Sequence, residues 1–251
     1  MIAANTIALV RTPPIANECP NCGFLAWCKS ANLTLSESKK VRDFTTHGRT
    51  IEPGSYLYNA GAPFISLYAI NSGFLKTTLA DKDGREQVTG FCMAGEIAGL
   101  DAIGSGTHEC DTIALEASSV CGLRYADFQR LMLAIPALQL HLVRMMGSEI
   151  SRDQGLMLLL GMMSAGERVA VFLLNLSVRY AARGFSETRF RLPMSRAEIG
   201  SYLGLKLETV SRTLSHFQEI DAIAINGKSI DLKSIPAIRQ MIAVYGSPKD
   251  H

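Results

Sequence analysis

Three of the six cysteines in this 251-residue chain lie within ten residues, in the stretch CPNCGFLAWC from Cys19 to Cys28. Thiolates are the ligands of iron-sulfur clusters and of structural zinc, and both kinds of site usually take four ligands. Three cysteines in one loop therefore predict a metal or cluster site whose fourth ligand lies elsewhere. A C-x2-C-x5-C loop can surround three corners of a [4Fe-4S] cluster while the folded body supplies the fourth.

Structural zinc is the main alternative, because zinc accepts the same thiolates. Such sites usually take their ligands from two C-x2-C pairs, and this chain has one, Cys19 and Cys22. The spacing therefore favours a cluster while leaving zinc open. Cysteines that only fill a core are less favoured, since the tail around Cys19 and Cys22 has few apolar neighbours to bury them.

The composition is that of a folded globular protein, with 47% hydrophobic and 19% charged residues. The net charge is only +2, so a nucleic-acid contact would need a local basic surface. The start, MIAANTIALVRTPP, lacks the basic region of a secretory signal. The longest strongly apolar stretch, GLMLLLGMM, is far shorter than the roughly 18 residues of a membrane span. We therefore expect a cytoplasmic protein without membrane contact, where clustered cysteines are metal ligands or redox groups before they are disulfides.

The segment from about residue 50 to 125 has short apolar runs separated by glycines. The glycines recur at intervals of about ten residues, with aromatic and β-branched residues between them; they are Gly54, Gly61, Gly73, Gly84 and Gly95. This spacing predicts a compact antiparallel β-barrel or roll.

A helical period begins at Ile135, with Pro136 suited to the first helical turn. The apolar residues mostly fall three or four apart, at Ile135, Leu138, Leu142, Met146, Ile150, Met157 and Leu160. The stripe is about 39 Å long at 1.5 Å per residue, so it outreaches the predicted roll. We expect part of it to meet a second copy in a parallel, coiled-coil-like dimer, with Leu142, Met146, Ile150 and Met157 at the interface. Asp153 interrupts the stripe and would face its twin across the two-fold axis.

Two capping boxes mark helices in the last third of the chain. Ser164–Glu167 begins a helix that runs to about residue 182, and Ser195–Glu198 begins the next one. After the second box, Gly200 is a small residue where two helices would cross, Gly204 supplies a turn and Val210 points to the core. This spacing predicts a helix-turn-helix.

The stretch AIAINGKSIDL alternates around Asn226-Gly227, a signal for a type I′ hairpin that would form a wing beside the second helix. The residues of that helix not needed for packing, Glu208, Ser211 and Arg212, suit contacts with base edges. Phosphate contacts would come from Arg196, Lys206 and Lys228.

This order of elements resembles the CRP/FNR family of bacterial transcription regulators over nearly the whole chain. The stretches GFCMAGEIAGLDAIGSG, RDQGLMLLL, ERVAVFLLNLS and FRLPMSRAEIGSYLGLKLETVSRTLSHFQ, together with the opening cysteines, are similar to its FNR (fumarate and nitrate reduction regulator) branch. The resemblance implies an α+β fold. An N-terminal antiparallel β-roll of the cyclic-nucleotide-binding jelly-roll type is followed by a long dimerisation helix and a C-terminal winged helix-turn-helix.

Members of that branch carry an oxygen-labile [4Fe-4S] cluster held by four cysteines. The matching residues here are Cys19, Cys22, Cys28 and Cys121, the last in SSVCGLRYADF after the final strand of the roll. Cys92 and Cys110 have no counterpart among the ligands. The resemblance also implies that the intact cluster promotes a homodimer, which binds an inverted TTGAT-type repeat in promoter DNA and controls genes of anaerobic metabolism. RNA polymerase would touch the loop DKDGRE around Gly84.

Cyclic-nucleotide binding, as in the CRP branch, is disfavoured. Gly95 and Glu96 match that pattern, but the following segment, GSGTHECDTIAL, has no arginine for the phosphate. A buried anionic phosphate without a positive partner would be costly.

An iron-sulfur enzyme or electron carrier is the other class of alternative. The sequence has no Rossmann fingerprint, no P-loop, no second cysteine set and no recognisable catalytic group, so we expect a regulator and not an enzyme.

We divide the chain into a cysteine-rich cluster segment, a β-roll sensor domain, a dimerisation helix, a winged helix-turn-helix domain and a tail; the ranges are 1–29, 30–133, 134–161, 162–240 and 241–251. The expected mechanism follows from this order. The cluster ties the N-terminal segment to the roll, and the long helix shifts until Ile150 packs well enough to overcome the Asp153 repulsion. Loss of the cluster to oxygen then favours the monomer.

Overall fold

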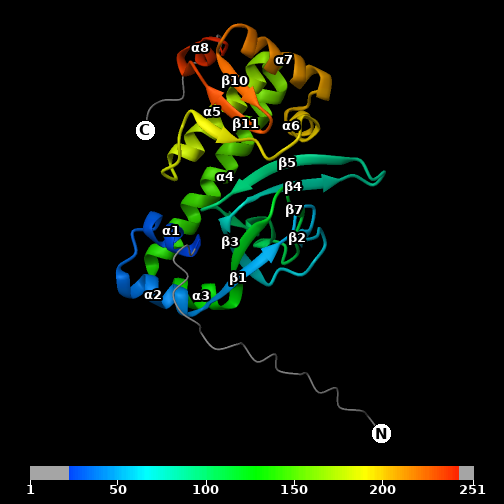
Figure 1. The fold of residues 1–251 in the computed structure, drawn as a ribbon. Coiled ribbons are helices and arrows are strands. Elements are labelled where there is room, and N and C mark those ends of the chain that lie inside the picture. The colour runs from blue at the N-terminus through cyan, green and yellow to red at the C-terminus, as the bar shows by residue number, and fades with distance from the viewer. Residues whose placement is uncertain (1–22, 243–251) are drawn as a thin grey trace.

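A computed structural model describes residues 23–242. Cys19 and Cys22 lie outside these residues. The described chain has a β-roll at one end, a helix-rich domain at the other, and one long helix that runs between them (Figure 1). This is the predicted α+β architecture.

Two short helices precede the roll: α1 (Gly23–Ser30) and α2 (Leu35–Asp43). Thr34 caps α2 in a capping box with Glu37. In Figure 1 both helices lie beside the first half of the long helix. The cysteine-bearing α1 is therefore placed where the roll and the long helix meet.

The roll consists of two four-stranded antiparallel sheets, in the orders β1-β8-β3-β6 and β2-β7-β4-β5. The strands are β1 (Thr45–Ile51), β2 (Tyr56–Tyr58), β3 (Ser66–Ser72), β4 (Phe74–Ala80), β5 (Glu86–Met93), β6 (Ile97–Ala98), β7 (Asp111–Ala114) and β8 (Ser118–Arg124), with a 3-10 turn, η1 (Leu100–Ala102). All five predicted turn glycines have positive φ. At Gly73, a Cβ would also lie 2.7 Å from the Cα of Ser118, so the turn between β3 and β4 requires glycine.

After α3 (Tyr125–Ala134), the long helix α4 (Pro136–Met162) begins with Pro136 in its first turn, as predicted. Its first half belongs to the roll, where Leu138 and Leu142 are buried in a cluster with residues of β3, β8 and α3. The placement of Leu142 in a dimer interface therefore needs correction: only 9% of the residue is exposed, and little of it is left for a partner.

The long helix also carries an exposed apolar face, which begins at Leu140. Its members recur three or four residues apart as far as Ile150, and Met157 follows after seven. Their exposed fractions are 53% for Leu140, 65% for Val143, 38% for Met146, 57% for Ile150 and 68% for Met157. Asp153 is exposed among them. Leu140 and Val143 belong to this face in place of Leu142.

The second domain contains α5 (Ala165–Ala181), β9 (Arg189–Arg191), α6 (Arg196–Leu203), α7 (Leu207–Glu219), β10 (Ile223–Asn226), β11 (Ser229–Leu232) and α8 (Ile235–Gln240). Both predicted capping boxes are present, at Ser164–Glu167 and Ser195–Glu198. A three-stranded sheet in the order β10-β11-β9 lies beside the helices.

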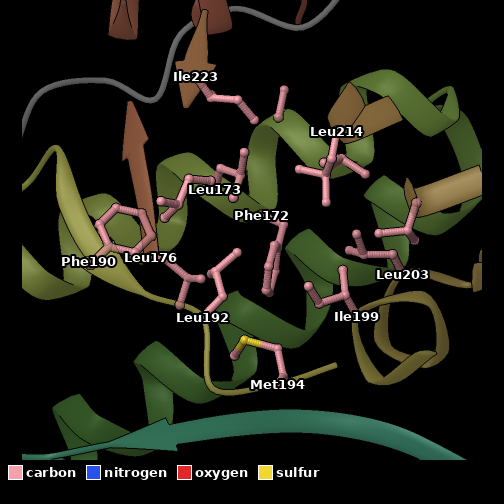
Figure 2. Packing of buried hydrophobic residues seen from close by; sticks show 14 of the residues in the cluster. Phe172, Leu173, Leu176, Phe190, Leu192, Met194, Ile199, Leu203, Leu214 and Ile223 are labelled. Carbon is pink, nitrogen blue, oxygen red and sulfur yellow. The ribbon is translucent and has the colours of Figure 1, made fainter. Parts of the chain in front are cut away.

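The core of this domain joins α5, α6 and α7, with Leu173, Ile199 and Leu214 among its members (Figure 2). Phe74 and Phe91, from the roll strands β4 and β5, belong to the same buried cluster. The ring centroids of Phe91 and Phe172 are 6.0 Å apart. The β4–β5 hairpin is thus part of the core that supports the helix-turn-helix.

Arg168 closes the junction between the long helix and the second domain. Its guanidinium donates to the carbonyl oxygen of Leu160 at 2.8 Å and of Leu203 at 3.0 Å, and its Nε donates to Met163 at 2.9 Å. These carbonyls lie at the C-terminal ends of α4 and α6, where helices leave acceptors unpaired. This side chain of α5 therefore joins the ends of two other helices.

The wing hairpin is present, but the type I′ turn around Asn226-Gly227 is a wrong prediction. Asn226 pairs with Ser229, so the two-residue loop is Gly227-Lys228. Among the described residues outside glycine, only Asn32 and Asp221 have positive φ. A type I′ turn needs positive φ at both central residues, whereas here only Gly227 has it, with φ of 59°.

Among the helices of residues 23–242, none is both long enough and apolar enough to cross a membrane.

We predict that Gly200→Ala destabilises the helix-turn-helix. A Cβ at position 200 would lie 2.5 Å from the carbonyl oxygen of Leu205, so the close neighbour is the turn backbone and not a crossing helix. Such overpacking costs about 1–3 kcal/mol. The midpoint of urea unfolding measures the loss. Gly166→Ala, which meets nothing within 4 Å, is the matched control, and equal midpoints for both variants would contradict the prediction.

Candidate functional site

Cys28 and Cys121 are brought together by the fold. Cys28 lies on α1, and both cysteines are fully buried in one apolar cluster with Phe24 and Leu123. Cys121 lies within β8, the last strand of the roll, and not after it as the sequence suggested. Two of the four predicted ligands, distant in sequence, therefore share one buried site.

The polar neighbours of the two thiols include Asn71, Ser38 and Arg42. The side-chain amide of Asn71 donates to Cys121 Sγ at 3.0 Å. Burial raises the pKa of the Cys28 thiol to about 11, although a hydrogen bond from Ser38 and the charge of Arg42 act in the opposite direction. Without a bound cation, Cys28 is therefore a protonated thiol at neutral pH. Metal binding would have to displace that proton.

The described part of the site suits a thiolate-held group. Thiols are the donors that iron-sulfur clusters require. The Nε of Arg42 is buried without a hydrogen-bond partner, and its positive charge acts on Cys28. Such a cation stabilises anionic sulfur. Within residues 23–242, no group of three or more His, Cys, Asp or Glu side chains is arranged to hold a metal ion. Cys19 and Cys22 are outside that range.

The helix that carries Cys28 rests on the long helix. The indole Nε1 of Trp27 donates to Met145 Sδ at 2.8 Å, and the Trp27 and His141 rings are 5.1 Å apart. A further hydrogen bond of 3.2 Å joins Ser30 Oγ and His141 Nε2. Burial lowers the pKa of His141, so this ring is neutral at pH 7. The contacts end about one turn before the exposed Ile150.

The predicted DNA-contact residues lie on or near α7. Val210 and Leu214 face the core, while Glu208 and Arg212 are exposed and Ser211 is half-buried. Lys206 is the exposed N-cap residue of the helix. The structure thus brings the three predicted base-contact residues to the outer side of one helix.

The two remaining residues predicted to contact phosphates, Arg196 and Lys228, differ in how their own domain holds their side chains. Arg196, in the first turn of α6, is half-buried, and burial lowers its pKa. The Nζ of Lys228 donates to the carbonyl oxygen of Pro193 at 3.0 Å. Lys228 is therefore tied to its own domain, although the residue is exposed.

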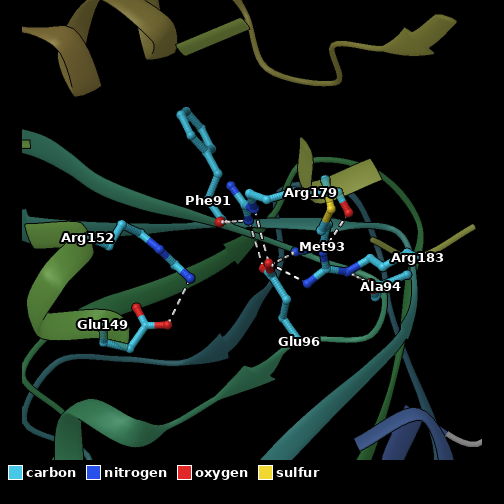
Figure 3. Close-up of polar contacts among 8 residues, drawn as sticks. All are labelled: Phe91, Met93, Ala94, Glu96, Glu149, Arg152, Arg179 and Arg183. Atoms are coloured by element: carbon cyan, nitrogen blue, oxygen red, sulfur yellow. Dashed lines mark hydrogen bonds and ion pairs between the residues drawn. The ribbon is translucent and has the colours of Figure 1, made fainter. Parts of the chain in front are cut away.

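Glu96, of the Gly95-Glu96 pair, is engaged by Arg179 of α5 and by Arg183, which directly follows that helix (Figure 3). Its carboxylate accepts from Arg179 and from Arg183 at 2.7 Å each. The residue lines a cavity of about 720 Å³ between the roll, α4 and α5. Sequence reasoning missed these arginines. The available signal was their spacing of four residues in the sequence.

Trp27 and Arg42 were also missed. The signal for Trp27 was that the single tryptophan of the chain directly precedes Cys28. Nothing in the sequence distinguishes Arg42 from the other basic residues of α2, since its role depends on where α2 packs.

Residues 48–134 match the cyclic nucleotide-binding domain family, and residues 167–241 match the Crp-like helix-turn-helix domain family. The transcriptional activator protein Anr of Pseudomonas protegens is 42% identical over 86% of this chain and 88% of that relative. The fumarate and nitrate reduction regulatory protein of Escherichia coli K12 is 39% identical over 94% of each chain. The structure of FixK2 from Bradyrhizobium japonicum superposes with a TM-score of 0.73 at 29% identity, covering 80% of this chain and 99% of that one.

A β-roll, a long helix and a winged helix-turn-helix with a free outer helix face define a DNA-binding transcription regulator and not an enzyme. The chain belongs to the CRP/FNR family and is of the FNR type.

Proposed function

We propose that the chain is an oxygen-responsive regulator. In this proposal Cys19, Cys22, Cys28 and Cys121 hold a [4Fe-4S] cluster, and the loaded protein binds an inverted TTGAT-type repeat in promoter DNA as a homodimer. It acts in the cytoplasm and controls genes of anaerobic metabolism. The observation that carries the proposal is the meeting of Cys28 and Cys121 in one buried cluster beside α4.

The relatives support the same reading. The Escherichia coli relative is named a fumarate and nitrate reduction regulatory protein, and both are reductions that cells use in place of oxygen respiration. The chain has Cys19 and Cys22 before α1 in the sequence and Cys28 on α1. Zinc remains the alternative occupant, and the absorption spectrum distinguishes the two, because zinc thiolates have no visible absorption.

When bound, the cluster would supply an oxygen-sensitive cross-link between the N-terminal segment and β8. The protein's own residues then transmit its presence. Arg42 stabilises anionic sulfur near Cys28, and Trp27 and Ser30 hold α1 against Met145 and His141 of α4. A change in the position of α1 therefore acts directly on the long helix.

The dimer interface in this proposal is the exposed face of α4. Met146, Ile150 and Met157 are all more than one-third exposed, and burial of that apolar area against a second copy favours association. Asp153 lies between Ile150 and Met157 and brings two like charges together. Dimerisation therefore requires that the apolar residues on either side of Asp153 pack well enough to offset this repulsion.

The assignment of domains along the chain is also part of the proposal: residues 1–29 bind the cluster, 30–133 form the sensor domain, 134–161 dimerise and 162–240 bind DNA.

RNA polymerase would contact the exposed turn between β4 and β5. In that turn Asp81 accepts from Arg85 at 2.7 Å, so the turn presents a fixed charged surface.

We further propose that the roll binds no cyclic nucleotide. Both carboxylate oxygens of Glu96 accept from Arg179 and Arg183. A nucleotide that used Glu96 would have to break these bonds and leave two arginines in need of new partners.

The first test replaces Cys121 by serine in protein prepared without air. We expect loss of visible absorption, of bound iron and sulfide, and of operator binding, because one cluster ligand is removed. The control is Cys92→Ser, because Cys92 is half-buried and has no predicted ligand role. This variant should keep its visible absorption, its bound iron and sulfide, and its operator binding. A Cys121→Ser protein that stays coloured, dimeric and bound to DNA contradicts the proposal. A wild-type protein that contains zinc and has no visible absorption contradicts the assignment of an iron-sulfur cluster.

The second test is Asp153→Ala in air. Two unit charges about 4 Å apart in water repel by about 1 kcal/mol, so the dimer dissociation constant should fall roughly fivefold. Analytical ultracentrifugation measures it. Gln154→Ala, next on the same helix and also exposed, should leave the constant unchanged. If the Asp153 variant depends on oxygen as much as the wild type does, Asp153 is not the gate.

The third test is Arg212→Ala on operator DNA. A bidentate arginine-guanine contact discriminates by about 1–3 kcal/mol, so affinity for the TTGAT repeat should fall about 5- to 150-fold while non-specific binding stays close to that of the wild type. Lys206→Ala, a predicted phosphate contact, should instead weaken binding to all sequences and lower the salt dependence by about one ion. Equal losses on operator and random DNA for Arg212→Ala would show that Arg212 does not read bases.

A further inference from the structure

We propose that Glu96, Arg179 and Arg183 form a positioning site that fixes the orientation of the DNA-binding domain on the roll. In a dimer this site sets the half-site spacing that the two recognition helices accept. The inference rests on the proposed binding of a dimer to an inverted repeat.

Each arginine makes a separate contact with the Glu96 carboxylate. Arg179 donates from Nε to Oε1 at 3.1 Å and from Nη2 to Oε2 at 2.7 Å. Arg183 donates from Nη2 to Oε1 at 2.7 Å. Because the two arginines are one helical turn apart on α5 and its C-terminal flank, rotation of α5 in either direction lengthens at least one contact.

The same guanidiniums also hold the roll backbone. Arg179 Nη2 donates to the carbonyl oxygen of Phe91 at 2.6 Å, and Arg183 Nε donates to that of Ala94 at 2.8 Å. The Met93 amide donates to Glu96 Oε2 at 3.0 Å, so the turn after β5 is closed around the carboxylate. Gly95 leaves room for Arg183, since a Cβ there would lie 3.3 Å from its Nε.

The site is shielded from water. The exposed side-chain fractions are 12% for Glu96 and 15% for Arg179. Burial alone would raise the pKa of Glu96, but the two arginines outweigh it and lower the pKa below its ordinary value. The carboxylate is therefore ionised at neutral pH, and separating it from its partners would leave buried charges uncompensated.

A second junction acts on the first helix of the helix-turn-helix. Lys76 of β4 pairs with Glu198 of α6 at 2.8 Å, and the Val88 amide of β5 donates to Ser201 Oγ at 2.9 Å. In Figure 1 the β4–β5 hairpin lies beneath α6. One junction alone would permit a pivot. The Glu96 site is a separate attachment through Arg179 and Arg183, and it removes that freedom.

The orientation of α5 is passed to the recognition helix. Leu173 and Leu176 of α5 share a buried cluster with Val210 and Leu214 of α7, so α5 and α7 move as one body. On the other side, the Glu149–Arg152 pair of α4, 3.0 Å long, faces the site (Figure 3). Glu96 therefore lies between the dimerisation helix and the DNA-binding helices.

The test compares wild type and Glu96→Gln, both loaded without air, on two duplexes. One carries the inverted TTGAT repeat at its natural spacing. The other has one base pair inserted at the centre, which moves one half-site by roughly 3.4 Å and 35°. We expect the wild type to prefer the natural spacing by tenfold or more, and the variant by less than threefold at unchanged dimer content.

The ratio of the two affinities separates positioning from stability. A variant that is merely less stable loses active protein on both duplexes alike, and the ratio stays at the wild-type value. Arg189→Gln, which breaks a mostly exposed pair with Asp231 in the same domain, is the control and should keep the full preference. If Glu96→Gln does not fold, Arg183→Gln, which retains the two Arg179 bonds, should give an intermediate ratio.

The outcomes distinguish this inference from the function on which it rests. A wild-type protein that binds neither duplex overturns the proposed function and the inference together. A wild type with a clear spacing preference that Glu96→Gln or Arg183→Gln retains in full overturns the inference alone.

Discussion

The structure depends on one constraint: the single uninterrupted helix α4 has to serve three different surfaces. Its first half completes the core of the roll through Leu138 and Leu142. The next turns receive α1 through His141 and Met145, and the outer side of the same turns stays exposed and apolar. A helix transmits displacement along its axis because its backbone hydrogen bonds make it stiff. In the proposed function, a movement of α1 therefore acts on the part of α4 that precedes Ile150 and Asp153.

The DNA-binding domain is not an independent unit on a flexible connection. Phe74 and Phe91 of the roll are part of its core, Arg168 joins the ends of α4 and α6, and Glu96 holds Arg179. Burial of apolar surface stabilises the contact without fixing an orientation, whereas charge-assisted hydrogen bonds are directional. Together these contacts attach the DNA-binding domain to the roll and fix its orientation.

Signals that depend only on close neighbours were reliable, whereas those whose outcome depends on which surfaces pack together were not. The turn glycines, the two capping boxes and the start of α4 were all predicted, because each depends on neighbours within four residues. Leu142 was misassigned because the apolar residues of α4 recur three or four apart on two faces of the helix. Only the position of the roll decides which of these faces is buried. The type I′ turn failed because strand pairing moved the loop by one residue, from Asn226-Gly227 to Gly227-Lys228.

The sequence by itself determined the order of elements, the class of protein and the residue types available for a cluster and for DNA, since these are written in spacing and composition. The resemblance to a known family, and not spacing, singled out Cys121. Only the tertiary structure decided that Cys121 and Cys28 share one buried cluster, that Trp27 of α1 contacts α4 and that Glu96 is paired with Arg179 and Arg183. Contacts between residues far apart in sequence are fixed by which surfaces are buried together, and no local pattern records that choice.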